Sequence, residues 1–267
     1  MSTAVSRDGT RIGYTRAGQG PAVVLVDGAL CYRNFGPMGE LSALLAPRFT
    51  VYSYDRRGRG ESGDTAPYAV EREIEDIAAL IAEAGGSAYV YGTSSGAALA
   101  LQAASMLPDI AKLAAFEAPY ITDATRPPTI ENYPEQLEAA LAENQRGDAV
   151  ILFMRYVGAP AEQAEQMRQT PMFPAFEAVA PTLLYDARCV ENPTDGESLP
   201  PALVAQLGGL KTPALILGGG ASPEWMLNTQ RSIASAIPGA QFRVLEGQTH
   251  ELAGSAVAPV LIEYFGG

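Results

Sequence analysis

Short apolar runs alternate with glycine-rich turns along the first third of the chain. Residues 22–26 (Ala-Val-Val-Leu-Val) are apolar at every position, which is typical of a strand that helices cover on both faces. Residues 11–16 and 50–54 are rich in β-branched and aromatic side chains and are bounded by turn signals. The pattern predicts strands at these three places.

Helical spacing appears next. Between residues 70 and 81 the apolar positions fall three or four apart, and the opposite side carries Glu71, Arg72, Glu73, Glu75 and Asp76. A strand at 87–91, an Ala/Leu-rich helix at 95–106 and a strand at 112–116 follow. This alternation predicts an α/β fold with a doubly wound, mostly parallel sheet.

The alternation stops between residues 121 and 210, where we expect a helical cap. Proline or glycine separates its predicted helices, at 136–144, 149–157, 161–167 and 173–190. The α/β pattern then returns with strands at 214–217 and 241–245 and helices at 225–237 and 256–264. We therefore expect a core formed by residues 1–120 and 211–267, with the cap at 121–210 inserted between its two parts.

Composition narrows the class of protein. The 267 residues are 47% hydrophobic and 18% charged, as in an ordinary folded enzyme, and a chain of this length needs no disulfide or metal to be stable. The net charge of −12 disfavours binding to nucleic acid or to anionic lipid. The two cysteines, Cys31 and Cys189, and a single histidine are too few for a disulfide framework or a zinc site.

Neither a secretory signal nor a membrane span is visible in the sequence. The first eight residues lack the order of a basic segment followed by an apolar one, and no run approaches the ~20 apolar residues of a membrane helix. We expect a soluble, cytoplasmic protein that acts on a small molecule, without a metal or an organic cofactor.

Residues 92–96 (Gly-Thr-Ser-Ser-Gly) carry the strongest chemical signal. They match G-x-S-x-G, and they lie between a predicted strand and a predicted helix, as that motif requires. The flanking glycines leave room for a tight turn that would hold the hydroxyl of Ser94 clear of the sheet. Ser94 is the predicted nucleophile, and a helix N-cap is the alternative role for it.

A serine hydroxyl needs a base, and His250 is the one histidine in the chain. It follows the last predicted strand, at the edge of the sheet where open α/β folds bind ligands. Two carboxylates are candidates for the acid that orients it. Glu117 ends the strand 112–116 in an apolar run where burial would be costly without a partner, and Glu224 follows the strand 214–217. We favour Glu117; the alternative role for it is a salt bridge to the cap or to an arginine such as Arg56 or Arg57.

The loop after the strand 22–26 is the predicted source of an oxyanion-binding N–H. We assign this role to the backbone N–H groups of Ala29 and Ser95, because Gly28 lets the chain bend close to the reacting centre and Ser95 opens a helix. Cys31 is expected to be a packed thiol.

The large apolar residues of the cap either pack the cap onto the core or line a pocket. The residues predicted to contact substrate are Leu30, Tyr120, Phe153, Met154 and Trp225.

These motifs together resemble the α/β-hydrolase superfamily over nearly the whole chain. The resemblance rests on residues 27–28, 55–62 (Asp-Arg-Arg-Gly-Arg-Gly-Glu-Ser), 92–96 and His250, and it implies a cap after the sixth strand of the fold. Two departures are visible: Asp27 stands where histidine is usual, and the acid follows the sixth strand. Both features look like the zearalenone-type lactonases. Some haloalkane dehalogenases also place a glutamate there, but they use an aspartate nucleophile, as epoxide hydrolases do.

The sequence therefore predicts a serine hydrolase that cleaves an ester or lactone through an acyl-enzyme. Three alternatives stay open on the same fold. A cofactor-free haloperoxidase or perhydrolase would use the same triad with peroxide, and a C–C hydrolase or lyase would use His250 as a base. A catalytically silent ligand-binding protein would keep only the architecture.

Overall fold

A computed structural model describes residues 2–122, 125–126, 130–191 and 198–267. Its centre is an eight-stranded sheet with the strand order β1-β2-β4-β3-β5-β6-β7-β8. The first two pairings, β1 with β2 and β2 with β4, are antiparallel, and all the others are parallel. The strands are β1 Ser2–Val5, β2 Arg11–Ala17, β3 Ala22–Val26, β4 Thr50–Tyr54, β5 Ala88–Thr93, β6 Ile110–Phe116, β7 Ala214–Gly219 and β8 Gln241–Leu245.

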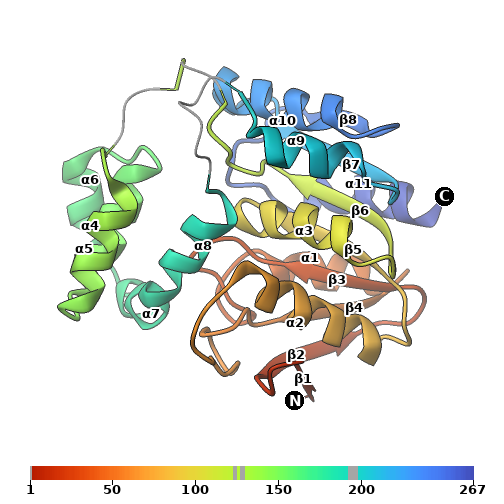
Figure 1. Ribbon diagram of the computed structural model, residues 1–267, viewed down its shortest axis with the longest axis horizontal. Helices are drawn as coiled ribbons and strands as arrows, with labels where there is room; N and C mark the ends of the chain where they lie inside the picture. Colours follow the sequence, from red (N-terminus) through yellow and green to blue (C-terminus); the bar gives the residue numbers. More distant parts are fainter. Residues whose placement is uncertain (1, 123–124, 127–129, 192–197) are drawn as a thin grey trace.

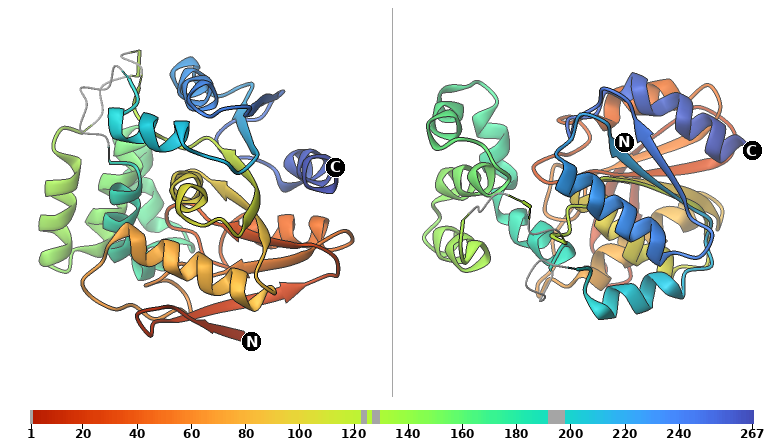
Figure 2. Two further views of the ribbon diagram at one scale, coloured as in Figure 1. Left: turned by 45° about the vertical axis from the view of Figure 1, so that its right-hand side comes forward. Right: turned by 90° about the horizontal axis from the view of Figure 1, so that it is seen from above.

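Helices cover both faces of this sheet, which explains the continuous apolar run of β3 (Figure 2). Val23 and Leu25 pack in one core cluster with α1 (Met38–Leu45) and α11 (Gly254–Gly266). Val24 and Val26 point to the opposite cluster, because successive side chains of a strand alternate between faces. The predicted doubly wound α/β fold is confirmed.

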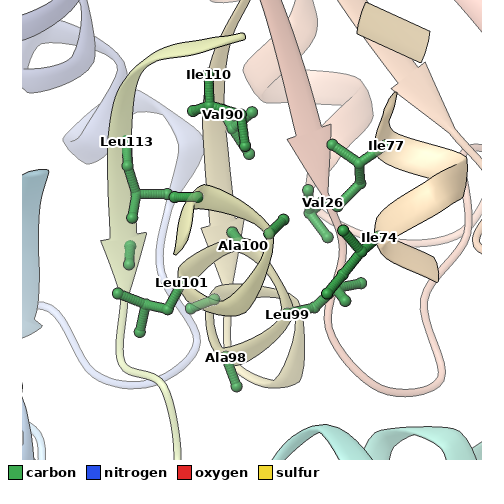
Figure 3. Packing of buried hydrophobic residues seen from close by; sticks show 14 of the residues in the cluster. Val26, Ile74, Ile77, Val90, Ala98, Leu99, Ala100, Leu101, Ile110 and Leu113 are labelled. Carbon is green, nitrogen blue, oxygen red and sulfur yellow. The ribbon is translucent and has the colours of Figure 1, made fainter. Parts of the chain in front are cut away.

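The second face is covered by α2 (Val70–Glu83), α3 (Ser95–Met106), α9 (Pro201–Gly208) and α10 (Glu224–Ala236). Figure 3 shows Leu99 and Leu101 of α3 among aliphatic residues of β5, β6 and α2. The short alanines of α3 let this helix lie close to the sheet, where Ala97 to Ala100 are completely buried. Its N-terminus is thereby fixed at the carboxyl end of β5.

The helix α2 has the predicted apolar stripe, but its other side differs from the expectation. Glu73 and Asp76, expected on a solvated polar side, are buried. They are buried because two arginines of the loop after β4 bind them: Arg56 contacts both carboxylate oxygens of Glu73, and Arg57 contacts both oxygens of Asp76.

A separate group of helices stands beside the carboxyl ends of the parallel strands (Figure 1). It follows β6 and has its own apolar cluster around Leu137, Val150 and Leu183. The predicted helix at 173–190 is two helices in the structure, because Pro181 lies in a 3-10 turn at Ala180–Thr182 and cannot continue the hydrogen-bond ladder. The helices of this cap are α4 Tyr133–Ala142, α5 Arg146–Tyr156, α6 Ala161–Gln166, α7 Phe173–Val179 and α8 Leu183–Cys189.

Three elements have no counterpart in the sequence prediction: β1, α1 and α9. The helix α9 falls inside the range expected for the cap, yet its Leu203 and Leu207 pack in the core cluster of the sheet. Among the residues that the structure describes, none of the helices has the length and apolarity needed to cross a membrane.

The close approach of α3 to β3 depends on Gly96. A Cβ built there would lie 2.4 Å from the carbonyl oxygens of Val26 and Asp27. We expect Gly96→Ala to lower the free energy of unfolding in urea by about 1–3 kcal/mol through overpacking. Gly266→Ala in α11 is the matched control, because a Cβ there meets no atom within 4 Å. Equal stability of the two variants would contradict this account of the contact.

Candidate active site

The predicted site residues gather where the strand order reverses. The chain leaves β3 toward β4 on one side and later adds β5 on the other side of β3. The crevice at such a reversal, outside the carboxyl ends of the strands, is where open α/β sheets bind ligands. The loop containing Ala29 follows β3, and Ser94 follows β5, so both lie at this point.

Ser94 occupies a strained turn between β5 and α3. Its backbone has φ +55° and ψ −129°, a conformation that costs a non-glycine residue about 1–3 kcal/mol. Neighbouring contacts hold it there: the Ser94 N–H donates to the carbonyl of Phe116 at 2.9 Å. A Cβ on Gly92 would lie 2.3 Å from the Gly96 carbonyl oxygen, so the turn also requires glycine. The side chain of Ser94 is thereby held at the N-terminus of α3.

His250 connects this serine to a buried carboxylate. His250 Nε2 lies 3.1 Å from Ser94 Oγ, and His250 Nδ1 lies 2.7 Å from Glu117 Oε2. The three groups come from the loops after β5, β8 and β6, which end at one edge of the sheet. The structure therefore brings together the three residues predicted to be nucleophile, base and acid.

Glu117 is held as tightly as the serine. It is completely buried, its φ is +47°, and its Oε1 accepts the backbone N–H of Gly219 at 2.8 Å. Both carboxylate oxygens therefore have partners, which offsets the cost of burying the charge. The alternative ion pairs with Arg56 and Arg57 do not form, because these arginines bind other carboxylates.

The second candidate acid lies elsewhere. Glu224 begins α10 and is exposed to solvent. The Nδ1 atom of His250 has Glu117 as its carboxylate partner. The geometry therefore favours Glu117 over Glu224.

Two cavities meet at Ser94. The first, of about 500 Å³, lies between α1, α11 and the loop after β3, and the second, of about 650 Å³, lies under the cap. Their described walls share a set of eight residues: Ala29, Ser94, Phe153, Met154, Val157, Phe176, His250 and Glu251. Most of the remaining wall is apolar, so each cavity suits a hydrocarbon or aromatic group.

Most of the predicted substrate contacts are wall residues. Leu30 lines the first cavity, Trp225 lines the second, and Phe153 and Met154 line both. The structure does not support the prediction that Tyr120 contacts substrate. Its side chain is 2% exposed, packs in the core cluster of the sheet and is absent from the described walls of both cavities. Its hydroxyl donates to the carbonyl of Cys189 at 3.4 Å, which explains its buried position.

The residues predicted to supply the oxyanion donors line the same space. Ala29 lines both cavities and Ser95 lines the second. Within the described part of the chain, neither backbone N–H has a hydrogen-bond acceptor. Ser95 is also the first residue of α3, where the helix dipole adds partial positive charge.

Cys31 lies in the wall of the first cavity beside Asp27. Burial, together with the nearby carboxylate of Asp27, raises the pKa of the Cys31 thiol to about 12. The thiol is therefore protonated near neutral pH, as expected for a packed cysteine and not for a nucleophile.

Sequence reasoning missed a buried ionic cluster under the site. The loop after β4 contributes Arg56, Arg57 and Arg59, all at most 1% exposed. Arg56 and Arg59 both bind Asp186, which belongs to α8 of the cap. Burial opposes ionisation of Asp186, but the charges of Arg59 and Arg56 lower its pKa below the ordinary value. The three arginines in the run 55–62 are visible in the sequence. Asp186, the cap residue that binds Arg56 and Arg59, could not be recognised from the sequence as their partner.

Asp27 is the carboxylate of this region without a dedicated cation. It lies in the wall of the first cavity, is 2% exposed, and its Oδ1 has no hydrogen-bond partner among the described residues. Burial raises its pKa to about 7, although Arg59 and Arg56 act in the opposite direction.

The comparisons with known proteins agree with this architecture. The sequence profile of the alpha/beta hydrolase family matches residues 20–260. An alpha/beta hydrolase from Sphaerobacter thermophilus DSM 20745 superimposes with a TM-score of 0.89 at 50% identity, covering 99% of this chain and 100% of that one.

Two more distant proteins extend the comparison. The enol-lactonase from Burkholderia xenovorans LB400 has a TM-score of 0.72 at 21% identity over the full length of both chains, which shows a shared fold alone. The uncharacterized hydrolase YraK of Bacillus subtilis (strain 168) is 28% identical over 151 residues. That match spans 55% of either chain, so this chain aligns with about half of the length of YraK.

The raised pKa of Asp27 predicts a specific pH dependence of stability. The unfolded chain loses this proton near pH 4, whereas the folded protein keeps it up to about pH 7. The folded state thus binds more protons in this window, and the contribution of Asp27 to the free energy of unfolding falls as pH rises through it.

We therefore expect Asp27→Asn to gain stability relative to the wild type by up to about 3 kcal/mol between pH 5 and pH 8. Urea unfolding of both proteins at several pH values measures the difference. A difference that stays constant across this range would show that Asp27 does not titrate there.

Proposed function

The chain belongs to the alpha/beta hydrolase family, and on that premise we propose that it is a serine hydrolase that cleaves an ester or lactone bond of a small, largely apolar substrate through an acyl-enzyme. The observation that carries this proposal is the continuous hydrogen-bonded chain from Ser94 Oγ through His250 to Glu117 Oε2. A serine hydroxyl that touches a histidine oriented by a carboxylate is the arrangement that activates a nucleophile.

Acylation begins when His250 Nε2 takes the proton of Ser94 Oγ. The Oγ atom bonds to the carbonyl carbon, and the electron pair of the C=O bond moves to the carbonyl oxygen. The N–H groups of Ala29 and Ser95 hold the resulting oxyanion. When the tetrahedral intermediate collapses, the C–O bond to the leaving alcohol breaks and that oxygen takes the proton from Nε2.

Deacylation repeats these steps with water. His250 Nε2 takes a proton from the water molecule, and the oxygen of that water bonds to the acyl carbon. Ser94 Oγ then leaves and takes back the proton from Nε2. Throughout, Glu117 accepts the Nδ1–H hydrogen bond, which keeps the ring in the tautomer that presents Nε2 to the serine and stabilises the protonated imidazole. In a lactone the leaving alcohol stays attached to the acyl group, so a single hydroxy acid is released.

The two cavities support an apolar substrate with groups on both sides of the bond that is cleaved. Since both walls include Ser94, one side of an ester would occupy the cavity next to Leu30 and the other the cavity next to Trp225. The enol-lactonase has the same fold, and its name is consistent with this class of reaction. The likeness of short motifs to zearalenone-type lactonases remains a prediction.

The first test of this proposal is covalent labelling. We expect a fluorophosphonate probe to label the wild-type protein on Ser94, and Ser94→Ala to lose labelling together with at least about 10³-fold of its activity on p-nitrophenyl esters and lactones. Ser105→Ala in α3 is a control, because Ser105 lies at the far end of this helix. A Ser94→Ala protein that retains full esterase activity would contradict the assignment.

The choice of acid is tested by two charge-neutralising variants. We expect Glu117→Gln to lower kcat by several orders of magnitude, since the amide no longer fixes the tautomer of His250 or stabilises its protonated form; comparable changes in triads cost about 10⁴-fold. Glu224→Gln is the matched control and should keep wild-type kcat. The opposite result, a large loss only in Glu224→Gln, would reassign the acid.

A further inference from the structure

The side chain of Arg59 connects the cap to the loop that carries the Ala29 N–H. We propose that Arg59 is a positioning residue for the oxyanion hole, and that Thr182 and Asp186 of the cap hold it in place. This inference rests on the proposed serine hydrolase function, because it concerns the group that would stabilise the oxyanion. It makes docking of the cap part of the catalytic apparatus.

All five N–H donors of the Arg59 guanidinium have acceptors, and they divide between two parts of the fold. On the cap side, Nε donates to Thr182 Oγ1 at 3.0 Å, and Nη2 donates to both carboxylate oxygens of Asp186 at 2.8 Å. On the core side, Nη1 donates to the carbonyl oxygens of Gly28 at 2.5 Å and Cys31 at 3.1 Å. The two carbonyl groups bracket Ala29 along the chain.

The hydrogen bond to Gly28 fixes the direction of the Ala29 N–H. The carbonyl of Gly28 and the N–H of Ala29 belong to the same peptide group, which is trans. In a planar trans peptide these two groups point in opposite directions. Arg59 holds the oxygen on the side of the ionic cluster, so the N–H points to the opposite side, toward the space that Ala29 and Ser94 line.

The loop needs such a constraint because its backbone is under strain and contains a flexible residue. Leu30 has φ +60°, and Gly28 gives the chain rotational freedom directly before Ala29. A second arginine supports the same stretch, since Arg56 Nη1 donates to the Asp27 carbonyl at 3.3 Å. Without these donors the Gly28–Ala29 peptide could rotate and turn its N–H away from the oxyanion.

The charge of Arg59 also strengthens the N–H as a donor. A cation bound to the carbonyl oxygen polarises the peptide group and makes its hydrogen more positive, and the effect is larger where water is excluded. Arg59 is 1% exposed. Asp186 neutralises this cation at the opposite end, and it also accepts the Ser95 hydroxyl at 2.7 Å. The cap carboxylate therefore contacts Ser95 directly and is linked to the Gly28–Ala29 peptide through Arg59.

Arg57 provides a matched control within the same loop. It is as deeply buried as Arg59, but it binds Asp76, Asp8 and the carbonyl of Arg72, with no described contact to the loop after β3. Lysine in place of either arginine keeps the charge but offers three donors, where Arg59 makes five described hydrogen bonds and Arg57 makes four. Both substitutions therefore remove a buried hydrogen-bond network, and only one of them releases the Gly28 carbonyl.

The experiment compares Arg59→Lys and Arg57→Lys with the wild type, using a p-nitrophenyl ester that the wild type hydrolyses and a trifluoromethyl ketone that adds to Ser94 to form an oxyanion. We expect Arg59→Lys to lower kcat about 10- to 100-fold with KM nearly unchanged. The affinity for the ketone should fall by a similar factor. Arg57→Lys should show the same loss of thermal stability with near-normal kcat and ketone affinity.

Two results would overturn the inference: Arg59→Lys with wild-type kcat and ketone affinity, or equal kinetic losses in both variants. If Arg59→Lys does not fold, Thr182→Val decides, because it removes the acceptor of Nε while Arg59 itself stays in place. This substitution also removes the hydrogen bond that the Thr182 hydroxyl donates to the Val179 carbonyl within the cap. A severalfold lower kcat at unchanged KM then supports the inference, and an unchanged kcat contradicts it. Failure of the proposed function looks different, because the wild type itself would neither hydrolyse the ester nor react with a fluorophosphonate.

Discussion

The hydrogen bond between Glu117 and His250 is the interaction on which the site depends. A completely buried carboxylate is costly unless both of its oxygens are bound, and here the imidazole and the Gly219 N–H bind them. The same contact brings the single histidine of the chain from the loop after β8 to the serine after β5. In the proposed mechanism, loss of this contact leaves Ser94 without an oriented base at the point where the two cavities meet.

A second buried system joins the cap to this centre. Arg56 and Arg59 bind Asp186, a residue more than a hundred positions later in the chain, and donate to the carbonyls of Asp27 and Gly28 as well. Buried ion pairs are a weak source of stability compared with apolar packing of equal volume. Their value here is geometric, because each guanidinium has several donors in a fixed plane and can hold a peptide group and a carboxylate in one arrangement.

Much of the fold was predictable because local patterns determine it. The apolar run of β3 and the periodicity of α2 reflect which faces are buried, and the GTSSG turn fixes where a strand meets a helix. The grouping of Ser94, His250 and Glu117 was predictable from chain order and from an isolated glutamate in an apolar run. What failed depended on distant partners: Glu73 looked like a solvated residue of α2 until Arg56 was found against it, and Tyr120 looked like a wall residue although the core encloses it. No local signal points from Arg59 to Asp186.

Direct observation of an acyl-enzyme is the measurement that tests covalent catalysis most closely. Wild-type protein mixed rapidly with excess p-nitrophenyl ester should release a burst of p-nitrophenol equal to the enzyme concentration wherever deacylation is slower than acylation. In acid-quenched samples, mass spectrometry should then find the acyl group on the peptide that contains Ser94. Turnover of the ester with the acyl group on another residue would contradict the mechanism, and so would undiminished turnover in a protein that lacks the Ser94 hydroxyl.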